Sequence, residues 1–540
     1  MNFQDILKQI REESLAERYK GHEFEKLMRE WLRADRRYSD LEHVWMWSDF
    51  PCRDSFGGDR DVGIDLVAKT RWGEYWAIQC KCYAEHTVID KPAVDTFLAT
   101  SSRSFTDPVS GQKLQFSNRL WISTTEHWGP NAEEAIQNQE PPVNRIGLRD
   151  LEESSVDWDK LLSGFEGKQA LVSEKKGLFP HQKKAVQEAA AHFKDNDRGK
   201  LIMACGTGKT FTALKIAENL IGEKGLILFM VPSIALLNQT LNAWAIDSED
   251  EIKAVCICSD IKASRKIKED DTPDSPVDLA LPATTNPVSI KERLLRYRAH
   301  KGLVVVFSTY QSVDAVSEAQ KALLRETNGE YGEFDLIICD EAHRTTGVKL
   351  SDEDESEFTK IHNNEKVRGK KRLYMTATPR IYGQSAKIKA SNMDCVLCSM
   401  DDEKLYGREF HRLNFSSAVK NGLLTDYKVL VLTVNEGSIP AKILQDVKNK
   451  DIKELNYDDT SKLIGVINGL SKKIRGDDGK TWEVDPRMMR RAVAFCSQIG
   501  NELKPGTSKN TASVLPKVSE LYNEILNEQE KAHSVRIQAK

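Results

Sequence analysis

Cysteine is scarce in this sequence, and long apolar runs are missing. The 540 residues include ten cysteines, spread too thinly for the dense disulfide framework of a small secreted domain. The longest apolar runs, at 226–231 and 303–307, have the length of β-strands, whereas a membrane-spanning helix needs about 20 apolar residues. The first residues include acids and lack the apolar core of a secretory signal. These absences predict a cytoplasmic protein that does not cross a membrane.

The sequence also lacks a strong overall charge. Its formal net charge is −4, so the composition as a whole does not indicate a nucleic-acid-binding protein. A local basic channel is still compatible with this value, because binding follows the local field. Cys395 and Cys398 form a single pair with no second pair nearby, whereas a structural zinc site normally has four ligands. We therefore expect no zinc site there.

Length and patterning predict an α/β protein of several domains. A chain of 540 residues typically forms three or four domains at about 150 residues each. The N-terminal region has the apolar spacing of a helix, and strand patterns follow it. After a glycine- and lysine-rich stretch, short aliphatic strands alternate with helical stretches, which predicts a parallel sheet covered by helices on both faces. We expect a first domain at 1–163, a linker at 164–178, a sheet domain at 179–400 and a further unit at 401–540.

The strongest motif is a glycine-rich loop, ACGTGKT, at residues 204–210. It follows an apolar strand and precedes a helical stretch, so backbone N–H groups at the start of that helix can close on phosphates. The strict pattern has glycine where this chain has Met203, so a plain glycine-rich turn is the alternative. The strand–loop–helix order favours a nucleotide site, with the lysine on the phosphates and the final threonine on Mg²⁺. The residues predicted to bind ATP here are Gly206, Thr207, Gly208, Lys209 and Thr210.

The segment FDLIICDEAH, at 334–343, supplies the acidic half of such a site. Its apolar residues predict a buried strand, and ligands bind at the carboxyl ends of the strands in a parallel sheet. Asp340 is therefore expected to hold Mg²⁺, and Glu341 to polarise the attacking water. A solvated acidic loop is the alternative, but the upstream phosphate loop favours the catalytic interpretation.

Together these segments resemble the superfamily-two helicases and translocases over residues 179–380. In the segment FPHQ, Gln182 matches the glutamine that reads adenine in that family. The segments VPSIALLNQT (231–240) and STYQS (308–312) look like the motifs that contact the DNA backbone. The resemblance assigns the coupling of hydrolysis to movement to His343, Thr376 and Thr378.

The resemblance also implies a second RecA-like lobe, which closes over ATP and contributes an arginine finger. We expect that lobe to start near residue 401, with RAVAFCS (491–497) as its first motif. No later segment of the QxxGRxxR type is found in the sequence. The second lobe is therefore expected to be incomplete in this chain: either the chain is a fragment, or the finger comes from elsewhere.

The N-terminal region contains the segment WAIQCKCY, at 76–83, in which a lysine stands between two cysteines. In a strand, successive side chains point to opposite faces. Cys80 and Cys82 then share a face with tryptophan and isoleucine, where a cysteine packs as a small apolar residue. Gln79 and Lys81 share the other face. The pattern favours packing over redox chemistry at the cysteines, since no reactive-thiol context is present.

An acid on the preceding strand completes a candidate nuclease site. Asp65 alternates with apolar neighbours and can face Gln79 and Lys81 across a hairpin. The carboxylate of Asp65 and the amide oxygen of Gln79 suit Mg²⁺. Lys81 can orient the water that attacks a phosphodiester and stabilise charge on the phosphate. The alternative is an ordinary polar strand face with Asp65 in a turn.

The segment GGDRDVGIDL (57–66), followed by QCK, resembles the Mrr-like branch of the PD-(D/E)xK nuclease fold. In that branch glutamine replaces the usual second acid. The resemblance implies Asp65, Gln79 and Lys81 as catalytic positions, and it adds Glu25 from the first helix. Two nearby acids could substitute for an assigned one: Asp59 and Asp61.

A nuclease of this kind ahead of a helicase motor resembles the N-terminal part of ATP-dependent restriction enzymes, which include Type I motor subunits and single-chain Type ISP enzymes. The implied fold is a restriction-endonuclease-like domain followed by RecA-like parallel-sheet lobes, the second incomplete. The implied function is translocation on double-stranded DNA with ATP and Mg²⁺, and cleavage of phosphodiesters. Methyltransferase and specificity domains or subunits are implied as partners, because no FxGxG or NPPY-type methyltransferase motif is found here.

Two other functions fit the same sequence. A helicase–nuclease of DNA repair, or of another phage-defence system, would have the same two domains, and cleavage specificity for unmodified DNA separates it from a restriction enzyme. A truncated DNA-binding fragment without turnover would fit the missing arginine finger, and DNA-stimulated ATP hydrolysis would exclude it.

Overall fold

The computed structural model describes most of the first 427 residues and two short strands beyond them. The chain divides into two compact units, one of residues 1–265 and 272–425 and the other of residues 266–271 and 426–540. The described ranges are 2–13, 17–57, 62–164, 167–171, 175–259, 275–349, 358–385, 396–427, 473–475 and 481–483.

In the smaller unit, the described residues form one antiparallel strand pair. β17 (Lys473–Arg475) pairs with β18 (Thr481–Glu483). The strand expected at 491–497 as the first motif of a second lobe lies outside the described residues.

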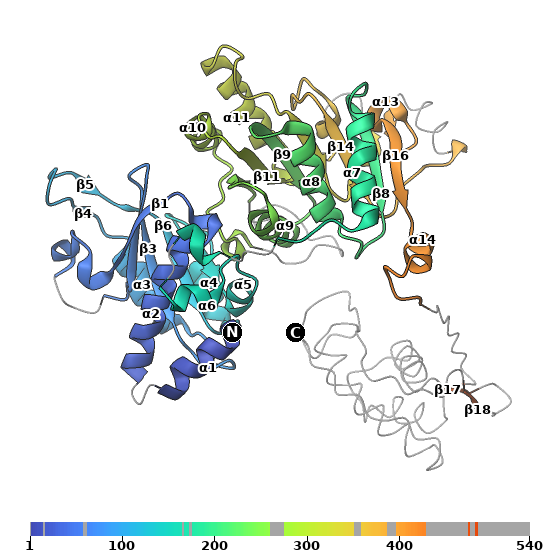
Figure 1. Ribbon diagram of the computed structural model, residues 1–540. Coiled ribbons are helices and arrows are strands. Elements are labelled where there is room, and N and C mark those ends of the chain that lie inside the picture. The colour runs from blue at the N-terminus through green and yellow to red at the C-terminus, as the bar shows by residue number, and fades with distance from the viewer. Residues whose placement is uncertain are drawn as a thin grey trace, which may run out of the picture. The chain divides into compact units, whose positions relative to one another are not determined.

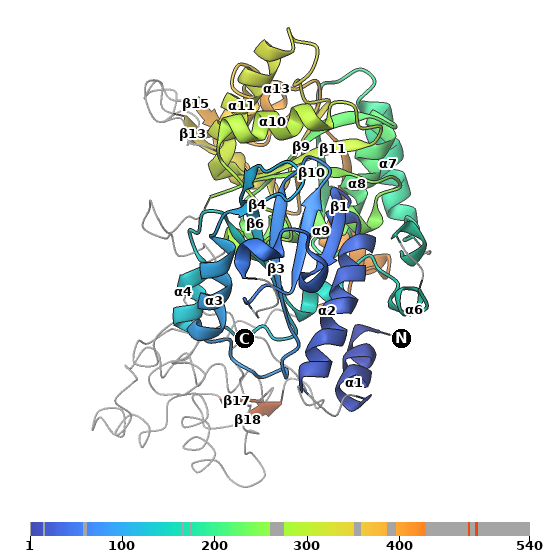
Figure 2. The same cartoon turned by 90° about the vertical axis from the view of Figure 1, so that its left-hand side faces the viewer.

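The N-terminal part of the larger unit is a mixed five-stranded sheet (Figure 2). Its first three strands are antiparallel, and the last three run parallel to one another. Gly73 has a φ of 82° in the turn between the second and third strands, a conformation that favours glycine. In spatial order the strands are β1 (Leu41–Met46), β2 (Leu66–Thr70), β3 (Tyr75–Lys81), β6 (Phe116–Ser123) and β7 (Val143–Ile146).

Helices cover both faces of this sheet because side chains alternate along β3. Trp76, Ile78 and Cys80 belong to a core with α2, whereas Ala77 belongs to a second core with α3 and α4. The two-residue alternation predicted for residues 76–83 is therefore confirmed along β3. The other elements are α1 (Phe3–Glu13), α2 (Glu17–Ala34), α3 (Lys91–Ser101), β4 (Phe105–Thr106), β5 (Lys113–Leu114), α4 (Pro130–Ile136), α5 (Leu148–Glu152) and α6 (Trp158–Leu162).

The second sheet of the larger unit has seven strands, all parallel (Figure 1). Most of its strands are aliphatic and buried, as expected for a parallel sheet covered on both faces. In spatial order they are β10 (Lys253–Ile257), β11 (Leu303–Thr309), β9 (Gly225–Val231), β12 (Leu336–Cys339), β14 (Arg372–Thr376), β8 (Arg198–Met203) and β16 (Arg408–Leu413). A separate antiparallel pair consists of β13 (Gly347–Lys349) and β15 (Val396–Cys398).

The helices between these strands confirm the predicted strand–helix alternation. Residues of α7, α8 and α9 pack in the core on one face of the sheet, and residues of α10 and α11 pack in the core on the other. The helices are α7 (Pro180–His192), α8 (Lys209–Ile221), α9 (Ile234–Asp247), α10 (Pro287–Tyr297), α11 (Val313–Glu326), α13 (Glu403–Tyr406) and α14 (Phe415–Lys420). Among the described helices, none combines the length and the apolar character needed to cross a bilayer.

The seven-stranded lobe extends past the predicted boundary at residue 400. β16 pairs with β8, and the backbone N–H of Ala204 donates to the carbonyl of Leu413 at 2.9 Å. The sequence of β16, REFHRL, mixes charged and apolar residues because this edge strand is partly open to solvent. It therefore lacks the aliphatic run by which the central strands were predicted. The compact unit continues to Thr425.

The predicted linker at 164–178 has packed residues of its own. Ala170 and Leu171 are buried, and Leu171 forms an isolated bridge with Val156. Further along, the Nζ atom of Lys175 donates to the carbonyl of Ser248 at 2.9 Å. The segment 164–178 is therefore attached to the domain of the five-stranded sheet through Leu171 and to the domain of the seven-stranded sheet through Lys175.

Candidate active sites

The glycine-rich loop joins β8 to α8 in a conformation that requires glycine. Gly206 and Gly208 have φ values of 80° and 82°, in the left-handed region that L side chains rarely adopt. A Cβ atom on Gly208 would collide with the side-chain amide of Gln182. Met203 is fully buried as the last residue of β8, so the position where the strict motif has glycine lies in regular strand and tolerates methionine.

Two side chains from the first turn of α7 pack against this loop. A ring nitrogen of His181 lies 3.0 Å from the carbonyl oxygen of Thr207, and Nε2 of Gln182 donates to the same oxygen at 3.4 Å. Oε1 of Gln182 accepts the backbone N–H of Phe179 at 2.9 Å. The ring of Phe179 is 62% exposed and stacks on His181. The residue predicted to read adenine thus contacts the phosphate loop, with an exposed aromatic ring beside it.

The acidic segment follows β12 and reaches back to the same loop. Asp340 is 5% exposed, and its carboxylate accepts the N–H of Glu341 at 2.8 Å. Glu341 has a φ of 46°, which turns the chain sharply after the strand. Its carboxylate pairs with Nζ of Lys209 at 2.9 Å. The structure therefore brings the two predicted acids and the predicted phosphate-binding lysine into one cluster.

The neighbouring carboxyl groups of this cluster ionise very differently. Burial raises the pKa of Asp340 to about 6, against the charge of Lys209 and with support from the charge of Glu341. Burial also acts to raise the pKa of Glu341, but the hydrogen bond with His343 and the charge of Lys209 outweigh it and lower that pKa to about 2. Such a divergence between adjacent carboxyls is typical of functional sites.

The residues predicted to couple hydrolysis to movement are in contact with one another. Nδ1 of His343 lies 3.0 Å from Oγ1 of Thr376 and 3.3 Å from Oε2 of Glu341. Oγ1 of Thr376 accepts the backbone N–H of Thr378 at 3.2 Å. These residues lie at the carboxyl ends of β12 and β14, which are adjacent in the sheet. The contacts therefore connect Glu341 to the segment that follows β14.

Two aromatic residues contact this site through carbonyl partners that the sequence did not predict. The buried Tyr310 donates its hydroxyl to the backbone carbonyl of Asp340 at 2.8 Å. Trp244, on α9, donates its indole N–H to the carbonyl of Thr210 at 3.1 Å. A buried Tyr or Trp normally finds a partner for its polar atom. The sequence therefore indicates that a partner exists, but not which carbonyl group it is.

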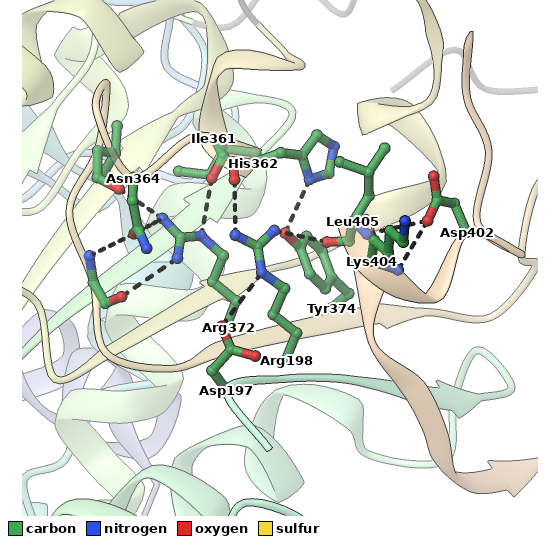
Figure 3. Close-up of polar contacts among 12 residues, drawn as sticks. Asp197, Arg198, Ile361, His362, Asn364, Arg372, Tyr374, Asp402, Lys404 and Leu405 are labelled. Carbon is green, nitrogen blue, oxygen red and sulfur yellow. Dashed lines mark hydrogen bonds and ion pairs between the residues drawn. The ribbon is translucent and has the colours of Figure 1, made fainter. Parts of the chain in front are cut away.

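A second polar cluster lies at the amino ends of β8 and β14, whereas the ATP site lies at their carboxyl ends (Figure 3). Arg372, the first residue of β14, is 1% exposed and donates to the side chain of Asn364 at 2.8 Å. Arg198, the first residue of β8, donates to the carbonyl oxygens of His362 and Leu405 at 3.0 and 2.9 Å. The phosphate loop follows the other end of β8, so this cluster does not belong to the ATP site. Its hydrogen bonds fix the chain that precedes β14.

The predicted nuclease residues meet at the start of β2. The backbone N–H of Asp65 donates to the carbonyl of Ile78 at 2.9 Å, which places Asp65 opposite β3. Its Oδ2 atom accepts hydrogen bonds from the side-chain amide of Gln79 and from the N–H of Cys80, the latter at 2.7 Å. Gln79 is 1% exposed. The structure therefore brings the predicted acid and the predicted amide into direct contact.

The thiol of Cys80 is buried in the core next to the nuclease residues of β3. Burial holds the pKa of Cys80 well above its usual value, and the charges of Asp65 and Glu25 raise it further, against Lys81. Glu25 extends from α2, where it is 22% exposed and lies 3.4 Å from a ring nitrogen of His22. A thiol kept protonated in the core is a poor nucleophile, which favours packing as the role of Cys80.

The donor atoms at both sites have the chemistry of ligands for a hard cation. Among the described residues, no three His, Cys, Asp or Glu side chains form a group that could hold a metal ion. A cation at the nuclease site would be held by the carboxylate of Asp65 and the amide oxygen of Gln79, whose amide nitrogen donates to Asp65, and such oxygens suit Mg²⁺. At the ATP site, Asp340 and Thr210 offer a carboxylate and a hydroxyl. Outside the described residues lie the two alternative acids, Asp59 and Asp61.

Two protein families match consecutive parts of the chain. Residues 33–168 match the family described as restriction endonuclease. Residues 175–381 match the family described as the res subunit of Type III restriction enzymes. The chain therefore combines a restriction endonuclease domain with a helicase domain, and the predicted order of nuclease and motor is confirmed.

Solved structures of two Type ISP restriction-modification enzymes resemble the chain. The ATP-dependent enzyme LlaBIII bound to DNA is 36% identical to it, with a TM-score of 0.72, over 97% of this chain and 31% of that one. A nuclease-deletion mutant of LlaGI in complex with a DNA substrate mimic is 36% identical, with a TM-score of 0.43, over 64% of this chain and 22% of that one. The chain thus spans less than a third of the length of either structure. No match is found among curated proteins.

Proposed function

We propose that this chain forms the nuclease and motor part of an ATP-dependent restriction enzyme that moves along double-stranded DNA and hydrolyses its phosphodiesters. The observation that carries the proposal is that one compact unit contains both an assembled phosphate-loop site and an Asp65–Gln79 pair within a restriction endonuclease domain. Similarity to a Type ISP enzyme over nearly the whole chain supports it. Since the chain spans a minor part of that enzyme, we assign target recognition to methyltransferase and specificity domains or subunits.

At the ATP site, Lys209 exchanges one anionic partner for another. It pairs with Glu341 in the structure, and the phosphates of bound ATP draw it away, which frees Glu341 to polarise the attacking water. Because the charge of Lys209 helps to hold the pKa of Glu341 low, the separation raises that pKa and makes the carboxylate a stronger base. Mg²⁺ held by Asp340 and Thr210 would neutralise charge on the phosphates.

At the nuclease site, Asp65 and Gln79 supply the oxygen atoms that would hold Mg²⁺. Lys81 orients the attacking water and stabilises the charge that develops on the phosphate. We assign Glu25, on α2, as a second carboxylate of this site. It thereby compensates for the neutral amide that stands on β3 where many nucleases have an acid.

The test measures cleavage and ATP hydrolysis separately on the same variants. Supercoiled plasmid is incubated with ATP and Mg²⁺, and we expect Asp65→Ala and Lys81→Ala to lose cleavage while retaining DNA-stimulated ATP hydrolysis. Lys209→Ala is expected to lose hydrolysis. Lys91→Ala, which removes a half-exposed lysine of the same nuclease domain, is the matched control and keeps both activities. Undiminished cleavage in both nuclease variants would place the nuclease site elsewhere.

A further inference from the structure

The helix α9 contacts the nucleotide loop with one side chain and the nuclease domain with another. Trp244 donates to the carbonyl of Thr210, in the first turn of α8, at 3.1 Å. Asn242 accepts, through Oδ1, a hydrogen bond of 3.0 Å from Nη1 of Arg37. A helix rises about 1.5 Å per residue, so the two contacts lie within about 3 Å of each other along its axis. A movement of α8 at the nucleotide loop therefore reaches Arg37 through a single rigid element.

The guanidinium of Arg37 is fixed on the nuclease side by a buried ion pair. Its Nε and Nη2 atoms bond to the two carboxylate oxygens of Asp35, each at 2.9 Å. The side chains of Arg37 and Asp35 are 3% and 1% exposed, and the ring of Trp31 lies 5.5 Å from the guanidinium carbon. A bidentate pair of this kind holds one geometry. Arg37 therefore moves with the nuclease domain and reaches α9 through its remaining terminal nitrogen.

The same ion pair is connected to the helix that carries Glu25. Oδ2 of Asp35 accepts the hydroxyl of Ser154 at 2.8 Å, and that hydroxyl oxygen accepts the indole N–H of Trp31 at 2.8 Å. Trp31 and Glu25 both belong to α2. Phe24, beside Glu25 on α2, and Cys80, beside Gln79 on β3, belong to the same core. A displacement of Arg37 is thus passed to a helix that borders the nuclease site.

Neighbouring contacts also attach residues 36–40 of the nuclease domain to the motor lobe. Nη1 of Arg36 donates to the carbonyl of Ser248, directly after α9, at 2.8 Å. The hydroxyl of Tyr38 donates to a backbone carbonyl of the motor lobe at 3.1 Å, and Asp40 pairs with Lys253 of β10 at 2.7 Å. These contacts hold the domain in place. The Arg37 bond differs from them because it is made to α9 itself.

We propose that Arg37 is a positioning residue through which α9 passes the nucleotide state of the motor lobe to the nuclease site. ATP binding shifts α8 and α9, the Asn242–Arg37 bond carries the shift to Asp35 and α2, and the position of Glu25 relative to Asp65 changes. Cleavage is thereby coupled to the ATP cycle. The inference rests on the proposed function, since it needs ATP to bind at the loop.

Hydrogen exchange tests this link without requiring cleavage. Amide exchange is measured with and without a non-hydrolysable ATP analogue and Mg²⁺, and we expect the analogue to change exchange in α2 and β3. Asn242→Ala removes the acceptor for Arg37 and should abolish that change, while the loop 204–210 still responds. The variant leaves the Asp35–Arg37 pair intact. Asn242→Asp, which restores an acceptor for Arg37, should recover the change. The matched control is Asn196→Ala, which removes a surface hydrogen bond to the carbonyl of His192.

Cleavage measured per ATP hydrolysed gives the second readout. We expect Asn242→Ala to lower this ratio by at least about fivefold, the lower end of typical coupling between sites, while DNA-stimulated hydrolysis and the melting temperature are retained. If Asn242→Ala had the cleavage ratio and the exchange pattern of the unmodified chain, the proposed link through Arg37 would be wrong. The link would also be wrong if, in the unmodified chain, the nucleotide changed exchange in the loop alone. No loop response at all would overturn the proposed function, and this inference with it.

Discussion

The ATP site and the nuclease site hold their acidic groups in opposite ways. At the ATP site two adjacent carboxyls are balanced by Lys209, and their pKa values diverge to about 6 for Asp340 and about 2 for Glu341. At the nuclease site the carboxylate of Asp65 faces a neutral amide and a backbone N–H. The first site is therefore arranged to redistribute charge when a ligand binds. The second is arranged to present one carboxylate in a fixed position.

The largest effect is expected when the charge balance of the ATP site is removed. Lys209→Ala leaves Glu341 without its cation and the phosphates without a positive partner, so DNA-stimulated ATP hydrolysis should fall by about two to three orders of magnitude. Release of radiolabelled phosphate with and without DNA measures it. Lys224→Ala, which removes an exposed lysine of the same lobe, is the control and should have no effect. Equal loss in both variants would contradict a specific role for Lys209.

The nuclease site should become more like the ATP site if it gains the acid that it lacks on β3. Gln79→Glu puts a second carboxylate against Asp65, so the Mg²⁺ concentration for half-maximal cleavage should fall by about tenfold. Two carboxyls in contact also raise the pKa of one of them, so cleavage should become more sensitive to acid. A Mg²⁺ titration of plasmid cleavage tests this, with Gln112→Glu at an exposed position as control. An unchanged Mg²⁺ requirement would remove Gln79 from the metal site.

A pH titration separates the two carboxyls of the ATP site. Because the pKa of Asp340 is raised to about 6, this group loses its charge as the pH falls below about 6, and about one tenth remains ionised one unit lower. Glu341, with a pKa of about 2, stays ionised over the same range. The KM for Mg²⁺ with ATP should therefore rise about tenfold between pH 7 and pH 5. A flat profile would show that Asp340 does not ligate the cation.

The smallest effect is expected at Cys80. Removing its buried sulfur by Cys80→Ala should lower the free energy of unfolding by about 1 kcal/mol and leave cleavage intact, because the thiol packs in the core. Chemical denaturation measures the first quantity and plasmid cleavage the second. Val109→Ala, at an exposed side chain of the same domain, should change neither. If the Cys80→Ala protein folds but no longer cleaves DNA, the thiol has a chemical role besides packing.

The sequence predicted those parts of the molecule in which one local pattern determines the structure. Alternation along β3 placed Gln79 and Cys80 on opposite faces, and the contact between Asp65 and Gln79 agrees with it. The phosphate loop and the acidic segment follow strands whose aliphatic runs are unmistakable. In each case the side chains that matter are fixed by the strand that precedes or contains them.

Features that depend on tertiary contacts were not predicted from the sequence. β16 mixes charged and apolar residues because it lies at a sheet edge, so its membership of the first lobe was not predicted. Arg37 lies in a short, polar turn, and its partner Asn242 is some two hundred residues away. The carbonyl partners of Tyr310 and Trp244 are equally remote. No periodicity connects such residues, since their contacts arise from how whole elements dock.

The place of β16 in the sheet determines where this protein can be divided for expression. A fragment that ends at residue 400 lacks β16, one of the two strands that pair with β8. The N–H and C=O groups on that edge of β8 are then exposed next to the nucleotide loop. Open edges of this kind pair with other chains and promote aggregation. A fragment that ends after Thr425 retains β16 and α14. Purification yield and light scattering of the two fragments would therefore differ before any activity is assayed.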